Sequence, residues 1–175
     1  MAFTVTRAAP ADALVIAAMV VVLTDEISVR VGDTSFNLNV HETSRRCGEM
    51  LVWGHYFVWL AWENDEPIGF IGLSESHALF AGGIMGTVQE FYVVPEARSK
   101  GVGAALLEAV KTFAAQRGMH RLEVCTPPVP VFDGNSTFYE RHKFEVTGGQ
   151  KMKFLPVEQG AVVPPVAHMV TSQRR

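Results

Sequence analysis

The sequence predicts an α/β fold of the mixed α+β kind, in which helices flank a central twisted mixed sheet. Two apolar runs, 56–62 and 67–73, are separated only by Glu63-Asn64-Asp65-Glu66, a pattern typical of an antiparallel hairpin. Further along, residues 100–117 repeat apolar side chains at helical spacing between two strand-like segments. A strand, a helix and a strand of this length indicate a right-handed crossover between parallel neighbours, so the sheet contains both kinds of pairing.

The individual elements follow from local patterns. Residues 3–6 alternate like a strand, and Ala9-Pro10-Ala11-Asp12 opens a helix, with proline at its start and a carboxylate in its first turn. Gly118 ends the helix at 100–117, and Asp133 or Asn135 can cap a short helix that runs to Lys143. We therefore expect about four helices and about six or seven strands. The expected strands are 3–6, 56–62, 67–73, 87–94, 122–126, 144–146 and 152–154, and a second helix is expected at 40–53.

The length and composition predict one domain. A chain of 175 residues with 48% apolar content can bury one substantial core. We expect this single domain to comprise residues 1–155. The segment 156–175 has no clear period, and we expect it to pack as a tail on the body or on a neighbouring subunit, with a homodimer as the assembly.

Charge and residue usage exclude several classes of partner. The net charge of −3 provides no basic surface for nucleic acid, and the most apolar stretch, 13–23, is too short to span a bilayer. The absence of a leader and the presence of only two cysteines, Cys47 and Cys125, favour a cytoplasmic location with buried, reduced thiols. The six histidines have no ligand spacing, so no metal site is expected.

The most informative segment joins the 87–94 strand to the following helix. Pro95 cannot donate to a sheet ladder, so the strand ends there and the chain turns. The next helix begins with the small residues Gly101, Gly103 and Ala104, which let a ligand approach the unpaired backbone N–H groups. Arg98 and Lys100 add positive charge, so the segment predicts a cradle for phosphate.

The spacing of these residues decides between phosphate ligands. No Gly-x-x-x-x-Gly-Lys run typical of nucleotide hydrolases occurs, and Leu106 stands where a dinucleotide fold needs its third glycine. The remaining pattern, Arg98-x-x-Gly101-x-Gly103-Ala104, resembles the acyl-CoA-binding segment of the GNAT superfamily of N-acetyltransferases. The resemblance extends to the preceding Phe91-Tyr92-Val93-x-Pro95 and to Phe138-Tyr139-Glu140-Arg141-x-x-Phe144, and the order of elements fits over about 3–155.

This resemblance implies a GNAT-like fold and acetyl-CoA as co-substrate. The pantetheine amides are expected to pair with the backbone of Phe91 and Val93, on either side of Tyr92, as an added strand does. The pyrophosphate is expected on the N–H groups of the turn and the first helical residues, with a backbone N–H near Val93 holding the oxyanion. The cofactor-binding residues expected in this segment are Phe91, Tyr92, Val93, Arg98, Ser99, Lys100, Gly101, Val102, Gly103 and Ala104.

Two residues are candidates for proton transfer. Tyr139 occupies the position of the tyrosine that, in many members of the family, gives a proton to the thioester sulfur. The alternative is that Tyr139 only packs the short helix. Glu90, beside the pantetheine-binding strand end, is the candidate general base. Strand alternation places it on the face opposite Phe91 and Val93, so an outward, solvated carboxylate is the alternative.

The chain departs from the family pattern at two places. Many members carry an asparagine seven residues before the tyrosine, where this chain has Phe132, so the candidate for that contact with CoA is Asn135. Lys143 stands where members tend to have glycine before the final phenylalanine, and a left-handed helix end suits lysine less well.

These observations predict an N-acetyltransferase that moves the acetyl group of acetyl-CoA to a primary amine by direct attack, with a small amine favoured. The alternatives are a catalytically silent acyl-CoA-binding module and a protein N-terminal or lysine acetyltransferase. The acceptor site is expected near the first two helices. The residues in that region that could line a pocket, or belong to the core instead, are Phe36, Trp53, Tyr56, Asp33, Glu42 and Glu49.

Overall fold

A computed structural model describes residues 2–32, 37–125 and 133–147, with only the backbone given for 133–136. Three single turns of 3₁₀ helix connect the regular elements: Pro10–Asp12, Leu79–Ala81 and Pro95–Ala97. In chain order, the strands and helices are β1 (Thr4–Arg7), α1 (Ala13–Val31), α2 (Val40–Trp53), β2 (Tyr56–Glu63), β3 (Glu66–Ala78), β4 (Gly83–Val93), α3 (Val102–Gln116), β5 (Arg121–Val124) and α4 (Asp133–Arg141).

The chain divides into two compact units, Met1–Thr137 and Phe138–Arg175. The first unit contains the whole sheet with α1, α2 and α3. The second begins inside α4 and includes Tyr139. A single domain over 1–155 stays a prediction, and the tail 156–175 and the strand expected at 152–154 lie outside the described residues.

The sheet is mixed, as the sequence predicts. Its strand order is β1-β2-β3-β4-β5; the first four strands run antiparallel to their neighbours, and β4 and β5 pair in parallel through the crossover helix α3. The described part of the chain contains these five strands, fewer than the six or seven expected.

The strand expected at 144–146 is absent from the described residues. Phe144 instead closes α4, because its N–H donates to the carbonyl of Tyr139 at 3.0 Å. The ring of Phe144 packs against that of Tyr139, and Val146 is 86% exposed, so its side chain does not pack as one on the buried face of a sheet does. The prediction of a strand at 144–146 is therefore wrong.

The β2–β3 hairpin turns within two residues. Asn64 and Asp65 have φ angles of 51° and 63°, and Glu63 pairs with Glu66 directly across the turn. Positive φ at both central residues is the type I′ geometry that matches the right-handed twist of a hairpin, and Asn and Asp tolerate it better than most residues do.

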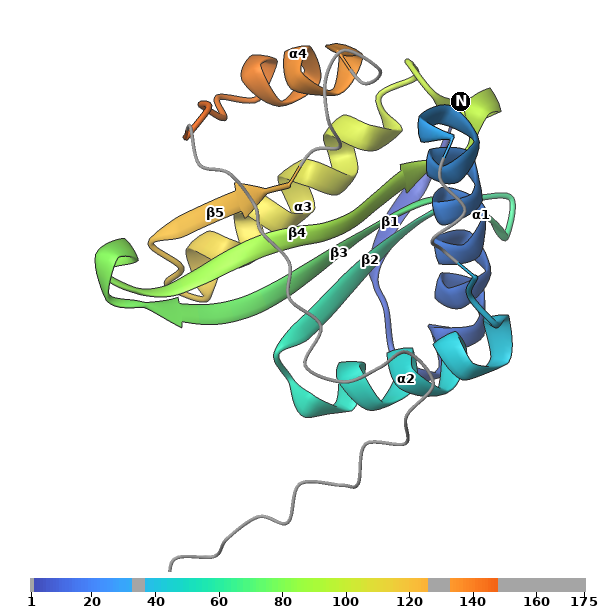
Figure 1. Cartoon of the computed structure of the whole chain (residues 1–175), viewed down its shortest axis with the longest axis horizontal. Helices are drawn as coiled ribbons and strands as arrows, with labels where there is room; N and C mark the ends of the chain where they lie inside the picture. Colours follow the sequence, from blue (N-terminus) through green and yellow to red (C-terminus); the bar gives the residue numbers. More distant parts are fainter. Residues whose placement is uncertain (1, 33–36, 126–132, 148–175) are drawn as a thin grey trace, which may run out of the picture. The chain divides into compact units, whose positions relative to one another are not determined.

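Alternation along the central strands divides the core between two faces of the sheet. Tyr56, Val58 and Leu60 of β2 face α1 and α2 in one apolar cluster. The intervening Phe57 and Trp59 face α3, where their rings lie 4.6 and 5.1 Å from that of Phe113. The first unit thus has three layers, with α1 and α2 on one side of the sheet and α3 on the other (Figure 1).

Among the described residues, no helix has both the length and the apolar content needed to cross a bilayer.

Candidate active site

The end of β4 extends beyond its parallel neighbour. The ladder between β4 and β5 ends with Val88 opposite Val124, whereas β4 continues to Val93 (Figure 1). On its other side β4 stays paired with β3, and just past its end the N–H of Val94 donates to the carbonyl of Ile68 at 3.0 Å. Because bonding directions alternate in an antiparallel pair, the N–H and C=O groups of Phe91 and Val93 point away from β3. The direction of these groups is the one that an added strand uses, and the Val93 carbonyl already accepts a hydrogen bond from Nε of Arg98 at 2.9 Å.

A β-bulge precedes this edge. Gly72 of β3 pairs with Glu90 and Leu73 pairs with Val88, so Gln89 is an extra residue on β4. A bulge interrupts the ladder and increases the local twist of its strand. It lies where β4 and β5 stop pairing, and the part of β4 that extends beyond β5 begins immediately after it.

The turn after β4 presents backbone N–H groups at the start of α3. Ser99 and Gly101 have φ angles of 61° and 88°, and Gly101 caps the helix without a side-chain hydrogen bond. The N–H of Ala105 donates to the carbonyl of Gly101 at 3.0 Å, which makes it the first in-helix bond. The N–H groups of the first helical residues precede that bond and have no partner within the helix, and the helix dipole makes their end positive.

The side chains of this turn differ in what they can contact. Ser99 and Lys100 are exposed, so the ammonium group of Lys100 can reach an anion on the turn. Val102 is fully buried, which leaves only its backbone for a ligand. Gly103 and Ala104, in the same first helical turn, are half-buried and small. The residues predicted to form the cradle therefore lie together on this turn and the first turn of α3, and their contact with a phosphate stays a prediction.

Arg98 makes contacts that the sequence did not indicate. Its Nε donates to the carbonyl of Val93 at 2.9 Å, and its Nη2 donates to Oε2 of Glu26 on α1 at 2.6 Å. The guanidinium carbon also lies 5.6 Å from the centre of the Tyr92 ring. Arg98 thus ties the end of β4 to α1, and direct contact with a phosphate stays a prediction for this residue.

Glu90 faces the helices α1 and α2 and not open solvent. Its side chain is half-buried, and its Oε2 accepts a hydrogen bond from the hydroxyl of Tyr56 at 2.7 Å. Burial raises the pKa of Glu90 above that of a free carboxyl, and the hydrogen bond from Tyr56 opposes this shift. A carboxyl that is partly accessible and more basic than usual can act as a general base.

Two further groups share the surroundings of Glu90. Burial, and then the nearby Glu90 charge, raise the pKa of the Cys47 thiol to about 11, which makes it a poor nucleophile at neutral pH. The same two causes raise the pKa of Tyr56, so its phenol stays protonated and donates. Cys47 is buried as expected, whereas Cys125 is exposed, so the prediction of a buried thiol is wrong there.

Tyr139 lies in the second unit. It is buried, its ring centre lies 5.3 Å from that of Phe138 and 5.5 Å from that of Phe144, and burial raises the pKa of its hydroxyl. These contacts fit both the packing role and the acid role. Asn135 lies in α4, but its side chain is outside the description, so its contact with CoA stays a prediction.

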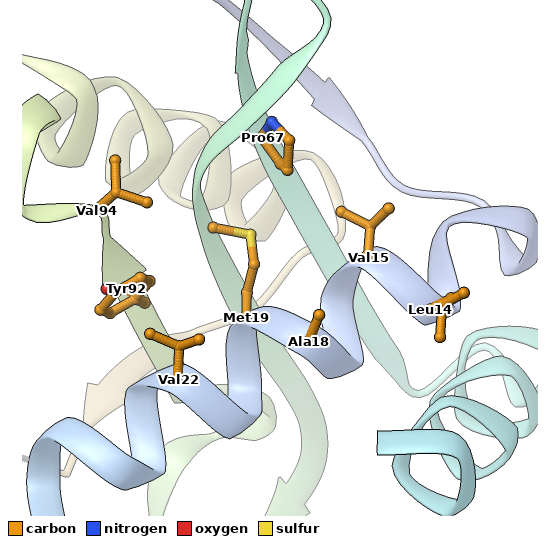
Figure 2. A pocket seen from close by; sticks show the side chains of 8 residues that line it. All are labelled: Leu14, Val15, Ala18, Met19, Val22, Pro67, Tyr92 and Val94. Atoms are coloured by element: carbon orange, nitrogen blue, oxygen red, sulfur yellow. The ribbon is translucent and has the colours of Figure 1, made fainter.

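Two grooves adjoin the end of β4 on the side of α1. The first, of about 360 Å³, is apolar except for the Tyr92 hydroxyl. Figure 2 shows its lining side chains, which are Leu14, Val15, Ala18, Met19, Val22, Pro67, Tyr92 and Val94. The second, of about 540 Å³, shares Val22 and Tyr92 with the first and adds the charged residues Asp25, Glu26, Arg30 and Arg98.

The residues expected to line the acceptor site do not form one cluster. Tyr56 is buried in the core with its hydroxyl on Glu90, whereas Trp53 is 67% exposed. Glu42 and Glu49 lie exposed on α2 and are paired with Arg45, and Glu42 also with Arg46. Asp33 and Phe36 are outside the described residues. No group of three His, Cys, Asp or Glu among the residues described could hold a metal ion.

Sequence reasoning missed two residues that shape the site. Gly72 lies between Tyr56 and Glu90, and a Cβ there would collide with the Tyr56 hydroxyl and come within 2.7 Å of Oε2 of Glu90. A glycine inside an apolar strand is the signal that could have indicated this close approach. Glu26 of α1 carried no such signal, because its partner Arg98 is 72 residues away.

Several known proteins resemble this chain in sequence or in fold. The chain is 37% identical over 67 residues to the "Uncharacterized N-acetyltransferase YhfO" of Bacillus subtilis, a match that covers 38% of this chain and 45% of that protein. An integron cassette protein, HFX_CASS3, from the mobile metagenome of Cole Harbour Salt Marsh is 29% identical over 93% of this chain and 92% of its own, with a TM-score of 0.69.

A predicted acetyltransferase from Clostridium acetobutylicum, solved with acetyl-CoA, has the same fold at 16% identity and a TM-score of 0.69, over 87% of this chain and 96% of its own. The sequence model of the acetyltransferase (GNAT) family matches residues 32–144, which include α2, the sheet from β2 to β5, and α3. The chain belongs to the acetyltransferase (GNAT) family.

Proposed function

We propose that this protein is an N-acetyltransferase that transfers the acetyl group of acetyl-CoA to a primary amine in a ternary complex, with a small amine favoured as acceptor. Its membership of the GNAT family supports the use of acetyl-CoA. The observation that carries the proposal is the arrangement of β4: the strand continues past the end of its ladder with β5 and leads directly into the amide-lined turn at the start of α3, with Glu90 on the helix-covered face.

The residues of this segment fit the cofactor. Phe91 and Val93 would hold the pantetheine amides with backbone groups directed away from β3. The N–H groups from Ser99 to Ala104 would hold the pyrophosphate, and Lys100 adds a mobile positive charge. The positive φ of Gly101 turns the backbone at this point, and no described atom lies within 4 Å of the place where a Cβ of this residue would be.

The proposed reaction needs few groups of the protein. Bound acetyl-CoA supplies the acetyl group as a thioester. Glu90 takes a proton from the attacking amine, directly or through a water molecule, and a backbone N–H near Val93 stabilises the oxygen that becomes negative. Tyr139, assigned from its sequence motif, returns a proton to the departing sulfur. Holding both reactants at attack distance supplies up to about 7 to 11 kcal/mol, which explains why few side chains are needed.

A thiol-release assay over a panel of amines tests this proposal. The panel contains small primary amines and peptides with a free N-terminus or lysine, and calorimetry measures CoA binding separately. Release of CoA with small amines is the expected result, and release only with peptides would assign the protein-modifying alternative. Binding without release would leave the silent acyl-CoA-binding module. Absence of CoA binding at millimolar levels would remove the proposed function altogether.

A further inference from the structure

We propose that Tyr56 is a positioning residue for Glu90: its hydroxyl, reaching across Gly72, holds one carboxylate oxygen and leaves the other for the acceptor amine. This inference rests on the proposed function, since it assigns a device to the base of that reaction. Nothing in the sequence motifs of β4 and α3 involves Tyr56, which lies at the start of β2.

The hydrogen bond between Tyr56 and Glu90 depends on Gly72, which has no side chain. Tyr56 belongs to β2 and Glu90 to β4, and β3 lies between these two strands. On β3, Gly72 is paired with Glu90 and leaves open the space through which the tyrosine reaches. A Cβ at this position would collide with the Tyr56 hydroxyl and lie 2.7 Å from Oε2 of Glu90. The bond therefore exists because the intervening strand carries glycine here.

The two oxygens of Glu90 have different surroundings. Oε2 accepts the Tyr56 hydroxyl at 2.7 Å, and within the described ranges no donor is bonded to Oε1. The Tyr56 side chain is in the core with 7% of the residue exposed, whereas Glu90 is only half-buried. A buried, rigid donor on one oxygen fixes the carboxylate plane, and the partly accessible second oxygen is then oriented to accept a proton.

The other groups around Glu90 do not compete for it. In the described structure, Cys47 of α2 and Tyr56 of β2 are the titratable groups whose pKa the Glu90 charge raises, and Gly72 is the β3 residue directly opposite Glu90. The residues that α1 adds to the apolar cluster containing Tyr56 carry no charge: Ala13, Ile16 and Met19 are buried, and Val15, Val20 and Leu23 are partly buried. The Tyr56 hydroxyl is thus the polar contact that opposes the desolvation of the Glu90 carboxylate.

The test compares three variants across pH. Tyr56→Phe removes the hydroxyl alone. Gly72→Ala keeps the hydroxyl but pushes it away from Glu90, because the new Cβ would occupy the space between them. Thr6→Val is the matched control, because it deletes a hydroxyl that accepts from Trp62 Nε1 at 3.0 Å on the edge strand, outside the site. Circular dichroism verifies the fold of each, and the profile of kcat/KM against pH is measured with acetyl-CoA and an acceptor amine from the panel.

We expect the acid limb of the profile to move to higher pH by roughly one unit in Tyr56→Phe, since a hydrogen bond to a charged group changes an ionisation equilibrium about tenfold or more. Gly72→Ala should move the limb in the same direction, and Thr6→Val should leave it in place. A loss of rate that is equal at every pH would mean that Tyr56 is merely structural, and would overturn the inference.

A second measurement does not depend on turnover. Carbon-13 NMR of labelled glutamate carboxyls, with Glu90→Gln to assign the signal, follows the titration of Glu90 directly. Its midpoint should rise in Tyr56→Phe and stay unchanged in Thr6→Val, and an unmoved midpoint would overturn the inference. A wild-type protein that acetylates no amine would instead refute the proposed function, and the carbon-13 titration would still decide whether Tyr56 holds Glu90.

Discussion

Oε2 of Glu26 accepts a hydrogen bond from Nη2 of Arg98 at 2.6 Å, which fastens the C-terminal half of α1 to the turn between β4 and α3. The same guanidinium bonds the carbonyl of Val93 through Nε. The pair therefore connects one of the helices that cover the Glu90 face of the sheet with the end of the strand assigned to the cofactor. The position of Arg98 depends on a helix far from it in sequence.

Replacing Glu26 by Gln should weaken the binding of acetyl-CoA. The hydrogen bond of Arg98 to Glu26 is the main cause of the lowered pKa of this carboxyl, so the neutral amide would hold Arg98 less firmly. We expect a rise in the Kd for CoA of several-fold with a smaller change in kcat, measured by calorimetry and steady-state kinetics. Glu108→Gln, which alters an exposed pair with Lys111 on α3, is the control. Equal Kd values for Glu26→Gln and the wild type would show that the bond between Glu26 and Arg98 does not support CoA binding.

Gly103→Glu should abolish CoA binding. The substitution places bulk and negative charge in the first turn of α3, where the N–H groups without helical partners would meet the pyrophosphate. Calorimetry with CoA measures the effect. Ala115→Glu adds the same charge at an exposed position near the other end of the helix and should retain binding. Unchanged affinity in Gly103→Glu would remove the proposed cradle.

Tyr139→Phe should lower turnover and leave the affinity for acetyl-CoA nearly unchanged. Burial raises the pKa of this phenol, so it is protonated at neutral pH and available as an acid. The measurements are kcat from thiol release and Kd from calorimetry. If the variant turns over as fast as the wild type, Tyr139 serves packing alone, through its contacts with Phe138 and Phe144.

The stability of the protein should fall in acid through Glu75. This carboxyl is almost fully buried and accepts from Nε of Arg117 at 2.7 Å, and that hydrogen bond is the largest cause of its lowered pKa. Because the folded pKa lies below the unfolded one, the pair contributes stability above the unfolded pKa and loses it as pH falls through the folded pKa.

Arg117→Gln tests this dependence. The free energies of unfolding of the variant and the wild type, obtained with denaturant between pH 7 and pH 3, should differ at neutral pH and converge in acid. A difference that is the same at every pH would show that Arg117 acts through its ring contact with Phe57 and not through its charge.

Local patterns predicted the elements well, because such patterns arise within one strand or helix. The second helix begins and ends at Val40 and Trp53 as expected, since Asn39 caps it with hydrogen bonds to the N–H groups of His41 and Glu42, and Gly54 ends it with a φ of 76°. The β2–β3 hairpin and the parallel crossover to β5 were likewise predictable.

The arrangement of the site was predictable only in part. The strand, turn and helix start of the cradle are contiguous in sequence, so a motif can indicate them. The bond from Tyr56 to Glu90 joins residues 34 apart, and that from Arg98 to Glu26 joins residues 72 apart. Such pairs arise only when packing brings distant elements together, and a single sequence carries no spacing signal for them.

Lys143 is a departure from the family pattern whose consequence is local strain. It adopts a φ of 68°, the left-handed conformation, at the end of α4, where the N–H of Phe144 bonds the carbonyl of Tyr139. A non-glycine residue costs about 1 kcal/mol or more in this conformation. Lys143→Gly should therefore stabilise the last turn of α4 by roughly that amount. Hydrogen exchange of the Phe144 amide would be slower by about fivefold.

Lys111→Gly, in the interior of α3, should instead destabilise its helix by about 1 kcal/mol, because glycine there only loses conformational freedom. Exchange at Phe144 that is as fast in the variant as in the wild type would mean that the helix end carries no strain for glycine to relieve.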